Sequence, residues 1–579
     1  MYYLPVTLLT ILSSSLFMAL VFIPALGIIF DTKIEKNSRL TNLGLLESGK
    51  LEEIDGLQGN YIRLLKLVLN HPFKVVIFTI ILLISIQLIY TKLGKGIEFF
   101  PPIEPDYAEI VVHARGNLSI YDKDTIIQKI EEITINNEFI SNIYSKSGDV
   151  PGGRKEGAED IIGNLKIELN DWKTRPTANL IIEKLYNQFN QLPGIRVEIL
   201  EKKDGPPKDK DIEIEISNSN YERLIYDAKL LLQYLKKKNW VLNLDDGLNT
   251  PGIDWELIVD RQQADKYGVD ISKVGNAVQM ITHGLKISEF MPENSDEEVD
   301  IVVKFQKNFQ TLDELDRLEI ESQEGPVALN SFVERIPVEK IGRINRVDSN
   351  RSINIMFDVP KDYLSNNIVK EIKSWILKNK SIKNSQIRFR GQEEDQEEAK
   401  EFLFKAFFIS IFLITIILIS TFEKFYYCFI ILTSVIMSTI GVMIGLLVTM
   451  QPFGVIMSGI GIIALAGIVV NNNIVLLDTY KYIRKQTLDV KEAIIRTGVQ
   501  RLRPVLLTTL TTFFGLVPMA MGLNINFINQ EINIGSPSSQ WWLQLSNAIV
   551  FGILFSFVLT LIVTPSLIYI GEKFFKNGN

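Results

Sequence analysis

The sequence contains few of the residues from which metal and redox centres are built. Its 579 residues include one cysteine, Cys428, and three histidines, His71, His113 and His283. A single cysteine leaves no disulfide framework and no CxxC pair for metal or redox chemistry. Because the histidines are scattered, a histidine-based metal centre is not expected. We expect His113 and His283 to be ordinary surface or strand histidines, and we expect neither a metal nor a cofactor.

Three motifs of energy-coupling and hydrolytic proteins are also absent. The sequence has no GxxxxGK[ST] phosphate loop, no HExxH and no GxSxG. Their absence argues against an ATPase, a zinc peptidase and a serine hydrolase. A formal net charge of −7 gives no basic footprint for nucleic acid. The chain is therefore expected to be neither an enzyme nor a nucleic-acid-binding protein, and ATP is not the expected energy source for any transport.

Long hydrophobic runs are what the sequence does have. A membrane-spanning helix needs ~20 mostly apolar residues. The first run lacks the flanks of a cleaved signal peptide, because MYYLPVTLL has no basic residue. The second is short, but YIRLLKLVLNHPFK before it is basic and amphipathic, which is typical of a helix at a membrane interface. The seven candidate spans are Leu4–Phe30, Phe73–Tyr90, Phe402–Thr421, Tyr427–Val448, Phe453–Leu477, Val505–Met521 and Leu545–Ile570.

Lysine and arginine give the spans an orientation. Segments 31–74 and 478–503 are both rich in these residues, none precedes the first segment, and residues 504–572 contain none. Cytoplasmic loops carry such an excess. The two basic segments and the C-terminus are therefore predicted to be cytoplasmic. The N-terminus and residues 91–400 and 522–544 are predicted to lie outside, and all seven spans then alternate consistently.

The large outer region is predicted to contain two copies of a β-α-β-β-α-β order, which is ferredoxin-like. In the first copy, YAEIVVHA, FISNIYSK, IIGNLKIEL and IRVEIL are the strands, and TIIQKIEEITI and TANLIIEKLYNQFNQL the helices. The second begins with strand DIEIEIS, helix ERLIYDAKLLLQYLKK and strand WELIVD, and resumes at RSINIMFDV, NNIVKEIKSWILK and QIRFRG. An insertion separates its two parts, with a helix (DISKVGNAVQMIT) and a hairpin (LKISEFM through DIVVKF).

The predicted fold class is therefore an α+β membrane protein. A transmembrane helix bundle of about seven spans carries an outer region of ferredoxin-like subdomains and one inserted subdomain. The predicted segments are 1–30 (span), 31–72 (cytoplasmic linker with an amphipathic helix), 73–92 (span), 93–205 (first subdomain), 206–260 with 346–400 (second subdomain), 261–345 (insertion) and 401–579 (five spans).

Two motifs in combination point to a family. GIGIIALAGIVVNNNIVLLD and RLRPVLLTTLTTFFGLVPMAM resemble the C-terminal half of resistance–nodulation–division (RND) exporters of the hydrophobic or amphiphilic type. GKGIEFFPPIEPD resembles the segment after the seventh helix of these exporters, and VTLLTILSSSLFMALVFIPAL resembles their sixth helix. DGPPKDKDIEIEI and VDRQQADKYGVDISKVGNAVQ are similar to porter and docking segments. The resemblance covers nearly the whole chain.

The resemblance implies a proton-antiport exporter of small amphiphilic compounds in the bacterial inner membrane, with a large periplasmic region. It implies a trimer that works with a periplasmic adaptor protein and an outer-membrane channel. The ferredoxin-like copies would be porter subdomains that bind cargo, and the insertion would be the docking subdomain. Full-length members have twelve helices in two halves and carry protons on paired aspartates of helix four. That helix is not in this chain, so a complementary N-terminal half is expected.

Three alternatives remain open. The chain could be half of an RND-type lipid exporter or metal exporter. Metal export is disfavoured because the spans lack acidic residues and the porter segments lack a Met or His cluster. The third alternative is a non-transporting fragment or accessory membrane subunit.

Three consecutive asparagines interrupt the fifth span. A buried amide in hydrocarbon is costly unless it is hydrogen-bonded, and neighbouring helical residues point ~100° apart, so the three cannot share one face. By resemblance, Asn471 falls where many drug exporters have a lysine that pairs with the helix-four aspartates, and Asn472 falls on the adjacent asparagine of the family. Both are candidates for the proton-relay neighbourhood, although packing between helices is the alternative. For Asn473, packing is expected.

The next span supplies two more candidates. Thr508 matches the relay threonine of the family, and the alternative is a hydroxyl bonded to the carbonyl one turn earlier. Arg501 matches a basic residue at the cytoplasmic mouth of the relay, but the positive-inside rule explains it equally well. Asp478 is expected to be a solvated helix end.

Glycines in two spans predict close helix contacts. Gly441 and Gly445 form a GxxxG motif, and Gly459, Gly461 and Gly467 lie along the following span. Small residues at such positions let two helix backbones approach each other.

Overall fold

The computed structural model shows two compact units. Residues 1–103 and 396–579 form a helical unit, and residues 104–395 form an α/β unit. Residues 30–55 of the predicted linker and 202–209 of the predicted porter segment lie outside the described residues. The described residues are 3–29, 56–114, 118–148, 160–201, 210–248, 253–293, 298–306, 309–322, 325–339, 344–360, 363–379, 382, 385–422, 424–527 and 530–576.

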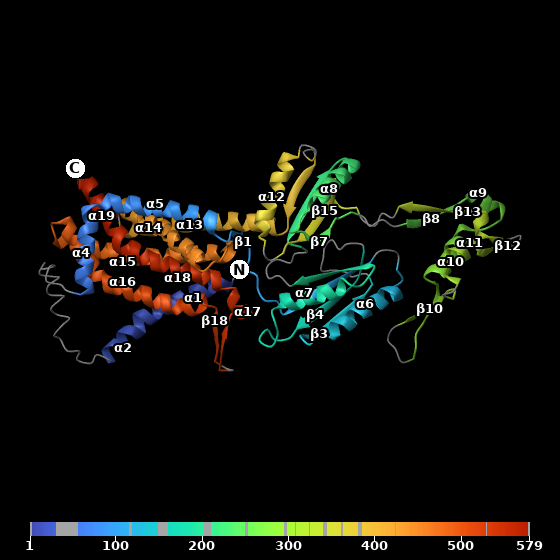
Figure 1. The fold of residues 1–579 in the computed structure, drawn as a ribbon, viewed down its shortest axis with the longest axis horizontal. Coiled ribbons are helices and arrows are strands. Elements are labelled where there is room, and N and C mark those ends of the chain that lie inside the picture. Colours follow the sequence, from blue (N-terminus) through green and yellow to red (C-terminus); the bar gives the residue numbers. More distant parts are fainter. Residues whose placement is uncertain are drawn as a thin grey trace. The chain divides into compact units, whose positions relative to one another are not determined.

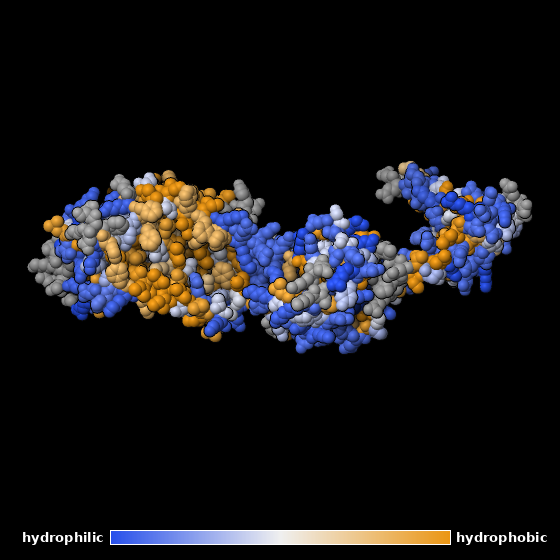
Figure 2. All heavy atoms as spheres, turned by 90° about the horizontal axis from the view of Figure 1, so that it is seen from above, coloured by the Kyte–Doolittle hydropathy of each residue, from blue (hydrophilic) through white to orange (hydrophobic). Residues whose placement is uncertain are grey.

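The described part of the helical unit contains seven helices that are long and apolar enough to cross a membrane. Each predicted hydrophobic run lies on one of them, and hydrophobic residues form a broad band on the surface of this unit (Figures 1 and 2). The helices are the run Leu9–Ile29 (part of α1, Tyr3–Phe17, a π-helical turn and α2, Ile23–Ile29), α5 (Pro72–Leu93), α13 (Gln392–Phe422), α14 (Phe425–Val448), α15 (Val455–Gln486), α16 (Val490–Ala520) and the run Leu543–Phe574 (α18, Leu543–Val558, a π-helical turn and most of α19, Thr564–Lys576).

Helix α18 packs against α14, α15 and α16. A Cβ atom on Gly441 of α14 would lie 2.5 Å from the carbonyl oxygen of Phe551 in α18, and one on Gly445 would lie 2.6 Å from the ring of the same residue. On α15, a Cβ on Gly461 would lie 3.0 Å from the Cβ of Ala548 in α18. The close helix contact predicted for the GxxxG motif is therefore confirmed.

The other two glycines of α15 differ from each other. A Cβ on Gly459 would lie 2.9 Å from Leu403 of α13, so this glycine also lies at a tight helix contact. A Cβ on Gly467 would have no described atom within 4 Å. The α15 face that carries Gly467 is therefore open in this chain.

The two ends of the helical unit are closed differently. Helix α4 (Leu57–Asn70) crosses one end and packs against α16 and α19 (Figure 1). It buries Leu65 and Leu69, and the hydroxyl of Tyr61 donates a hydrogen bond to the carbonyl of Leu561 (2.8 Å). At the opposite end, the short strand β1 (Ile97–Glu98) pairs in parallel with β17 (Phe453–Gly454), which leads into α15.

The first half of the α/β unit has the β-α-β-β-α-β order expected from the sequence. Its four strands form one antiparallel sheet in the order β3-β4-β2-β5, which is a split βαβ arrangement. Helices α6 and α7 pack their apolar residues on the sheet to form one core. The elements are β2 (Tyr107–Ala114), α6 (Ile120–Ile135), β3 (Ile140–Ser147), β4 (Ile161–Leu169), α7 (Ala178–Phe189) and β5 (Ile195–Glu201).

The second copy repeats this sheet order. Strand β7 pairs with β15, which is followed across the sheet by β6 and β16. A short strand β14 (Arg346–Val347) pairs antiparallel with the first residues of β15. Its core includes residues of both helices. The elements are β6 (Ile212–Asn218), α8 (Tyr221–Leu235), β7 (Leu242–Asp245), β15 (Asn350–Asp358), α12 (Ser365–Lys378) and β16 (Gln386–Arg390).

One predicted strand exists but was assigned to the wrong sheet. WELIVD lies in β8 (Ile253–Val259), which pairs with β13 (Val333–Glu339) in a separate two-stranded sheet. The place predicted for it is taken by β7, whose four residues LNLD are too short and polar to stand out as a strand. The insertion is therefore bounded by β8 and β13, and begins about eight residues earlier than predicted.

Inside the insertion, two predicted elements are confirmed. Helix α10 begins after Asp270, whose carboxylate accepts a hydrogen bond from the amide of Ser272 (2.9 Å). Strands β9 and β10 form the predicted antiparallel hairpin. The elements are α9 (Arg261–Lys266), α10 (Ile271–Thr282), β9 (Leu285–Phe290), β10 (Val299–Val303), α11 (Leu312–Arg317), β11 (Glu319–Ser322) and β12 (Gly325–Ala328).

The Gly441 contact gives a matched pair of variants. Gly441→Ala places a methyl group against the α18 backbone, so we expect it to destabilise the chain by ~1–3 kcal/mol, the usual range for overpacking. Gly467→Ala meets open space and is expected to be neutral or to stabilise by up to ~1 kcal/mol through helix propensity. Thermal unfolding of both variants in the same detergent checks this. Equal melting temperatures would contradict it.

Candidate functional site

The third asparagine of the triplet lies inside the helical unit. Asn473 is fully buried, and its Nδ2 donates to the carbonyl of Val469 one turn earlier (2.9 Å). Its Oδ1 accepts a hydrogen bond from the hydroxyl of Thr564 in α19 (2.8 Å), and that hydroxyl lies 3.3 Å from the hydroxyl of Ser434 in α14. Asn473 therefore holds α15 to two other helices, which is the packing role expected for it.

The other two asparagines differ in exposure. Asn472 is 8% exposed, whereas Asn471 is exposed on the surface of the unit. Gly467 and Asp478, one turn before and two turns after Asn471, are exposed as well, so the three share one helix face. Asp478 is exposed, as expected, but it does not end the helix, because α15 continues to Gln486. Asn471 therefore lies on the exposed face of α15.

Thr508 and Arg501 both lie on α16, but in different surroundings. Thr508 is exposed, and its hydroxyl donates to the carbonyl of Val505 in its own helix (3.0 Å). Arg501 donates through Nε to the hydroxyl of Thr479 in α15, so it links these two helices. The structure therefore joins Arg501 to α15. Among the described contacts, no hydrogen bond joins Asn471 to Thr508.

A carboxylate that we did not select from the sequence lies where β1 meets α18. Glu98 is partly buried and accepts a hydrogen bond from Nε2 of Gln544, the second residue of α18. Burial raises the pKa of Glu98 to about 7, although the hydrogen bond from Gln544 acts in the opposite direction. The signal available in the sequence was a single acidic residue between Ile97 and Phe99, eight residues beyond the end of the predicted span Phe73–Tyr90.

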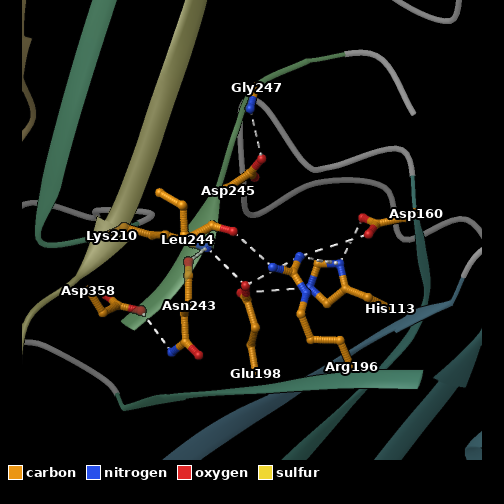
Figure 3. A network of polar contacts seen from close by, with 10 residues as sticks. All are labelled: His113, Asp160, Arg196, Glu198, Lys210, Asn243, Leu244, Asp245, Gly247 and Asp358. Atoms are coloured by element: carbon orange, nitrogen blue, oxygen red, sulfur yellow. Dashed lines mark hydrogen bonds and ion pairs between the residues drawn. The ribbon is translucent and has the colours of Figure 1, made fainter. Parts of the chain in front are cut away.

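A second site was also missed, and it centres on His113. This histidine lies on a strand, as expected, but it is only 2% exposed, so it is not a surface residue. Its Nδ1 lies 2.8 Å from a carboxylate oxygen of Asp160, and its Nε2 lies 3.7 Å from Glu198 (Figure 3). Arg196, two residues before Glu198 on β5, lies 3.7 Å from the carboxylate of Glu198.

This network continues from the first copy into the second. Nζ of Lys210, just before β6, donates to Glu198 (2.9 Å) and to the carbonyl of Asn243 in β7 (Figure 3). Arg196 donates to the carbonyl of Leu244, the next residue of β7 (2.9 Å). Lys210 is 4% exposed and Glu198 is fully buried. A buried ion pair therefore links the two sheets.

The charges in this network shift its protonation equilibria. Burial alone would lower the pKa of His113, but the hydrogen bond to Asp160 and the adjacent Glu198 raise it. Burial would raise the pKa of both carboxylates, but contact with His113 lowers each of them. Lys210 lowers the pKa of Glu198 further, and Arg196 lowers that of Asp160. The folded network therefore favours a protonated histidine between two carboxylates.

The raised pKa of His113 predicts a pH dependence. Because its pKa is higher in the folded state, His113 contributes its stabilisation fully below the unfolded value of about 6.5 and loses it as the pH rises through the folded value. His113→Gln is expected to remove this loss. Hydrogen exchange of the β2 and β5 amides, corrected for intrinsic rates, measures it. His283→Gln, at an exposed histidine, is the control and is expected to behave like the wild type.

Comparisons with known proteins agree on one architecture. A model of the AcrB/AcrD/AcrF family matches residues 2–570. The swarming motility protein SwrC of Bacillus subtilis (strain 168) is 22% identical over 532 residues, which cover 89% of this chain and 47% of SwrC. Two crystal forms of a heavy metal efflux pump superpose with TM-scores of 0.74 and 0.71 at 19% identity, covering 89% and 88% of this chain and 52% and 51% of the pump. The chain thus spans about half the length of these relatives.

Proposed function

Because the chain belongs to the AcrB/AcrD/AcrF family of RND transporters, we propose that it forms one half of a proton-driven exporter. The proposed cargo is a small amphiphilic compound taken from the periplasm or the inner membrane. A complementary N-terminal half completes the transporter, whether it lies on the same polypeptide or on another. Besides the family match, one structural observation supports this proposal, namely the exposure of Asn471.

An exposed asparagine side chain on a membrane helix needs a hydrogen-bond partner. Apolar side chains on α5, α13 and α16 can face lipid directly, but Asn471 and Thr508 carry polar groups on exposed surfaces of two contacting helices. A polar group in hydrocarbon is stabilised when another helix hydrogen-bonds it. We propose that the complementary half packs here and brings the helix-four carboxylates to Asn471, Asn472 and Thr508. An amide can hydrogen-bond a carboxylate without adding a charge.

The same proposal assigns roles to the α/β unit, to its insertion and to the two ends of the helical unit. The two split βαβ copies serve as porter subdomains, the insertion between β8 and β13 serves as the docking subdomain, and the α/β unit faces the periplasm. The end of the helical unit that carries α4 and Arg501 faces the cytoplasm, in agreement with the positive-inside rule. The transporter would work as a trimer with a periplasmic adaptor and an outer-membrane channel.

Export of a metal ion is the second candidate function, because a heavy metal efflux pump shares the fold. At 19% identity this likeness shows the fold alone. The described residues contain no group of three or more His, Cys, Asp or Glu side chains placed to hold a metal ion. Export of a lipid, and a non-transporting accessory role, are further outcomes that the same assay separates.

The proposal is tested by efflux in cells that express this chain with its complementary half. Efflux of an amphiphilic dye is expected to follow an imposed proton gradient, with a zinc or copper ion and a fluorescent phospholipid as alternative cargoes. Dye efflux that does not depend on the proton gradient would overturn the proton-driven mechanism. Metal or lipid efflux in place of dye efflux would overturn the proposed cargo, and no efflux of any cargo would favour the accessory role.

Asn471 and Asn473 make a matched pair within one helix. Asn471→Ala removes a proposed hydrogen bond to a carboxylate, worth ~1.5–3 kcal/mol, so we expect efflux to fall about tenfold or more at an unchanged melting temperature. Asn473→Ala leaves a buried Thr564 hydroxyl without its acceptor, so the melting temperature is expected to fall instead. If Asn471→Ala transports like the wild type, Asn471 has no part in the relay.

A further inference from the structure

Strands β1 and β17 connect the helices α5 and α15, and β1 lies at the end of the helical unit opposite α4 (Figure 1). β1 follows α5 and β17 leads into α15, and the amide of Phe453 donates to the carbonyl of Gly96 (2.9 Å). The hydroxyl of Tyr90 in α5 donates to the same carbonyl (2.9 Å). The start of α15 is therefore tied to the end of α5 through a short, well-bonded ladder. On the proposed orientation, this is the outer end of the membrane.

Gln544 brings α18 to this ladder. It is 4% exposed, and its Nε2 donates to Glu98 while its Oε1 has no hydrogen-bond partner among the described residues. The same oxygen lies so close to Gly454 that a Cβ there would be 1.8 Å away. The absence of a side chain at Gly454 thus makes room for the amide. The amide nitrogen of Gln544 is thus hydrogen-bonded, whereas its amide oxygen is buried without a hydrogen-bond donor among the described residues.

No cation neutralises Glu98 in the part of the chain that the structure describes. The nearby lysines, Lys92 and Lys95, are exposed, and neither forms an ion pair with it. Helix α13, which packs beside Phe99, carries the exposed residues Lys400, Glu401 and Lys405, of which the last two pair with each other (2.6 Å). The other described titratable group at the site is Tyr90, and β17 and the start of α18 contribute none.

The hydrogen-bonding capacity of the site changes with one proton. An ionised carboxylate can only accept, so it takes the N–H of Gln544. A protonated carboxyl can donate, and the unpartnered Oε1 of Gln544 is an acceptor on the same side chain. Turning the amide about its last bond exchanges the two arrangements. That turn would place an amide N–H, instead of an oxygen, against Gly454 at the start of α15.

We propose that Glu98 takes up and releases a proton from the outer side of the membrane, and that the Gln544 amide turns with it. The proton moves between outer water and a carboxylate oxygen of Glu98, and no other bond is made or broken. The starts of α15 and α18 thereby respond to the proton state of this site. A role in driving transport rests on the proposed function, whereas the titration of Glu98 does not depend on it.

The titration is measured on the full chain in lipid nanodiscs by infrared difference spectroscopy. One carboxyl band is expected to titrate at about pH 7 in the wild type and to be lost in Glu98→Gln. Glu401→Gln, at an exposed carboxylate, is the control and is expected to retain the band. Gln544→Leu removes the hydrogen bond to the charged form, so the midpoint is expected to rise. An unchanged wild-type band in Glu98→Gln overturns the proposal.

If Glu98→Gln does not fold, Gln544→Leu decides the matter, since an unshifted midpoint in that variant overturns the proposal as well. The transport role is tested in the co-expressed transporter, where Glu98→Gln is expected to lose the dependence of efflux on outer pH. Wild-type efflux that ignores the proton gradient would sink the proposed function but leave the titration standing. A proton-driven wild type with the same pH profile as Glu98→Gln would sink this inference alone.

Discussion

A polar group inside apolar surroundings has to be hydrogen-bonded, and the membrane part of this protein is organised around that requirement. Two of the three consecutive asparagines differ in how far they meet it. Asn473 finds Val469 and Thr564, so its helix is fixed to its neighbours. Asn471 is exposed on the surface of the unit, and in hydrocarbon a polar group there is stabilised when another helix hydrogen-bonds it. The same residue type therefore packs the bundle at one position and lies on the exposed surface of the unit at another.

Close packing of α18 positions the polar contacts at the end of the helical unit that carries β1 and β17. Gly441, Gly445 and Gly461 let α18 lie against α14 and α15 with their backbones nearly in contact. Because α18 is held this closely, its second residue, Gln544, reaches Gly454 and Glu98. A polar contact at the membrane surface thus depends on small residues within the membrane. Weaker contacts at these glycines would therefore also weaken the hydrogen bond between Gln544 and Glu98.

In the α/β unit, buried charged groups likewise require partners. Glu198 and Lys210 are both buried, and a buried charge requires a close opposite charge and hydrogen bonds to offset its desolvation. Their contact crosses from one split βαβ copy to the other, and His113 and Asp160 extend it on one side. The two copies are therefore joined by a network whose net charge depends on a histidine. Removing either partner of the central pair would leave a buried charge uncompensated.

The sequence determined the features that depend on local pattern. Hydrophobic runs of about 20 residues located the helices, lysine and arginine indicated their orientation, and alternation located most strands of the two copies. Because successive residues of a helix point ~100° apart, the sequence also predicted that the three asparagines face different directions, and a packing role for Asn473 could be expected. The sequence could not predict that LNLD, and not WELIVD, forms the second strand of the second sheet. A strand this short and polar is recognised only by its pairing with β15.

Only the tertiary structure decided which side chains meet. Glu98 and Gln544 are 446 residues apart in the sequence, and neither has a local pattern that predicts the other. His113 was expected to be ordinary because nothing near it in the sequence shows that Asp160 and Glu198 surround it. Period and composition are properties of neighbouring residues, whereas burial and ion pairing depend on the packing of distant segments. The sequence thus determined the helices and the repeats, and the folded chain determined the sites.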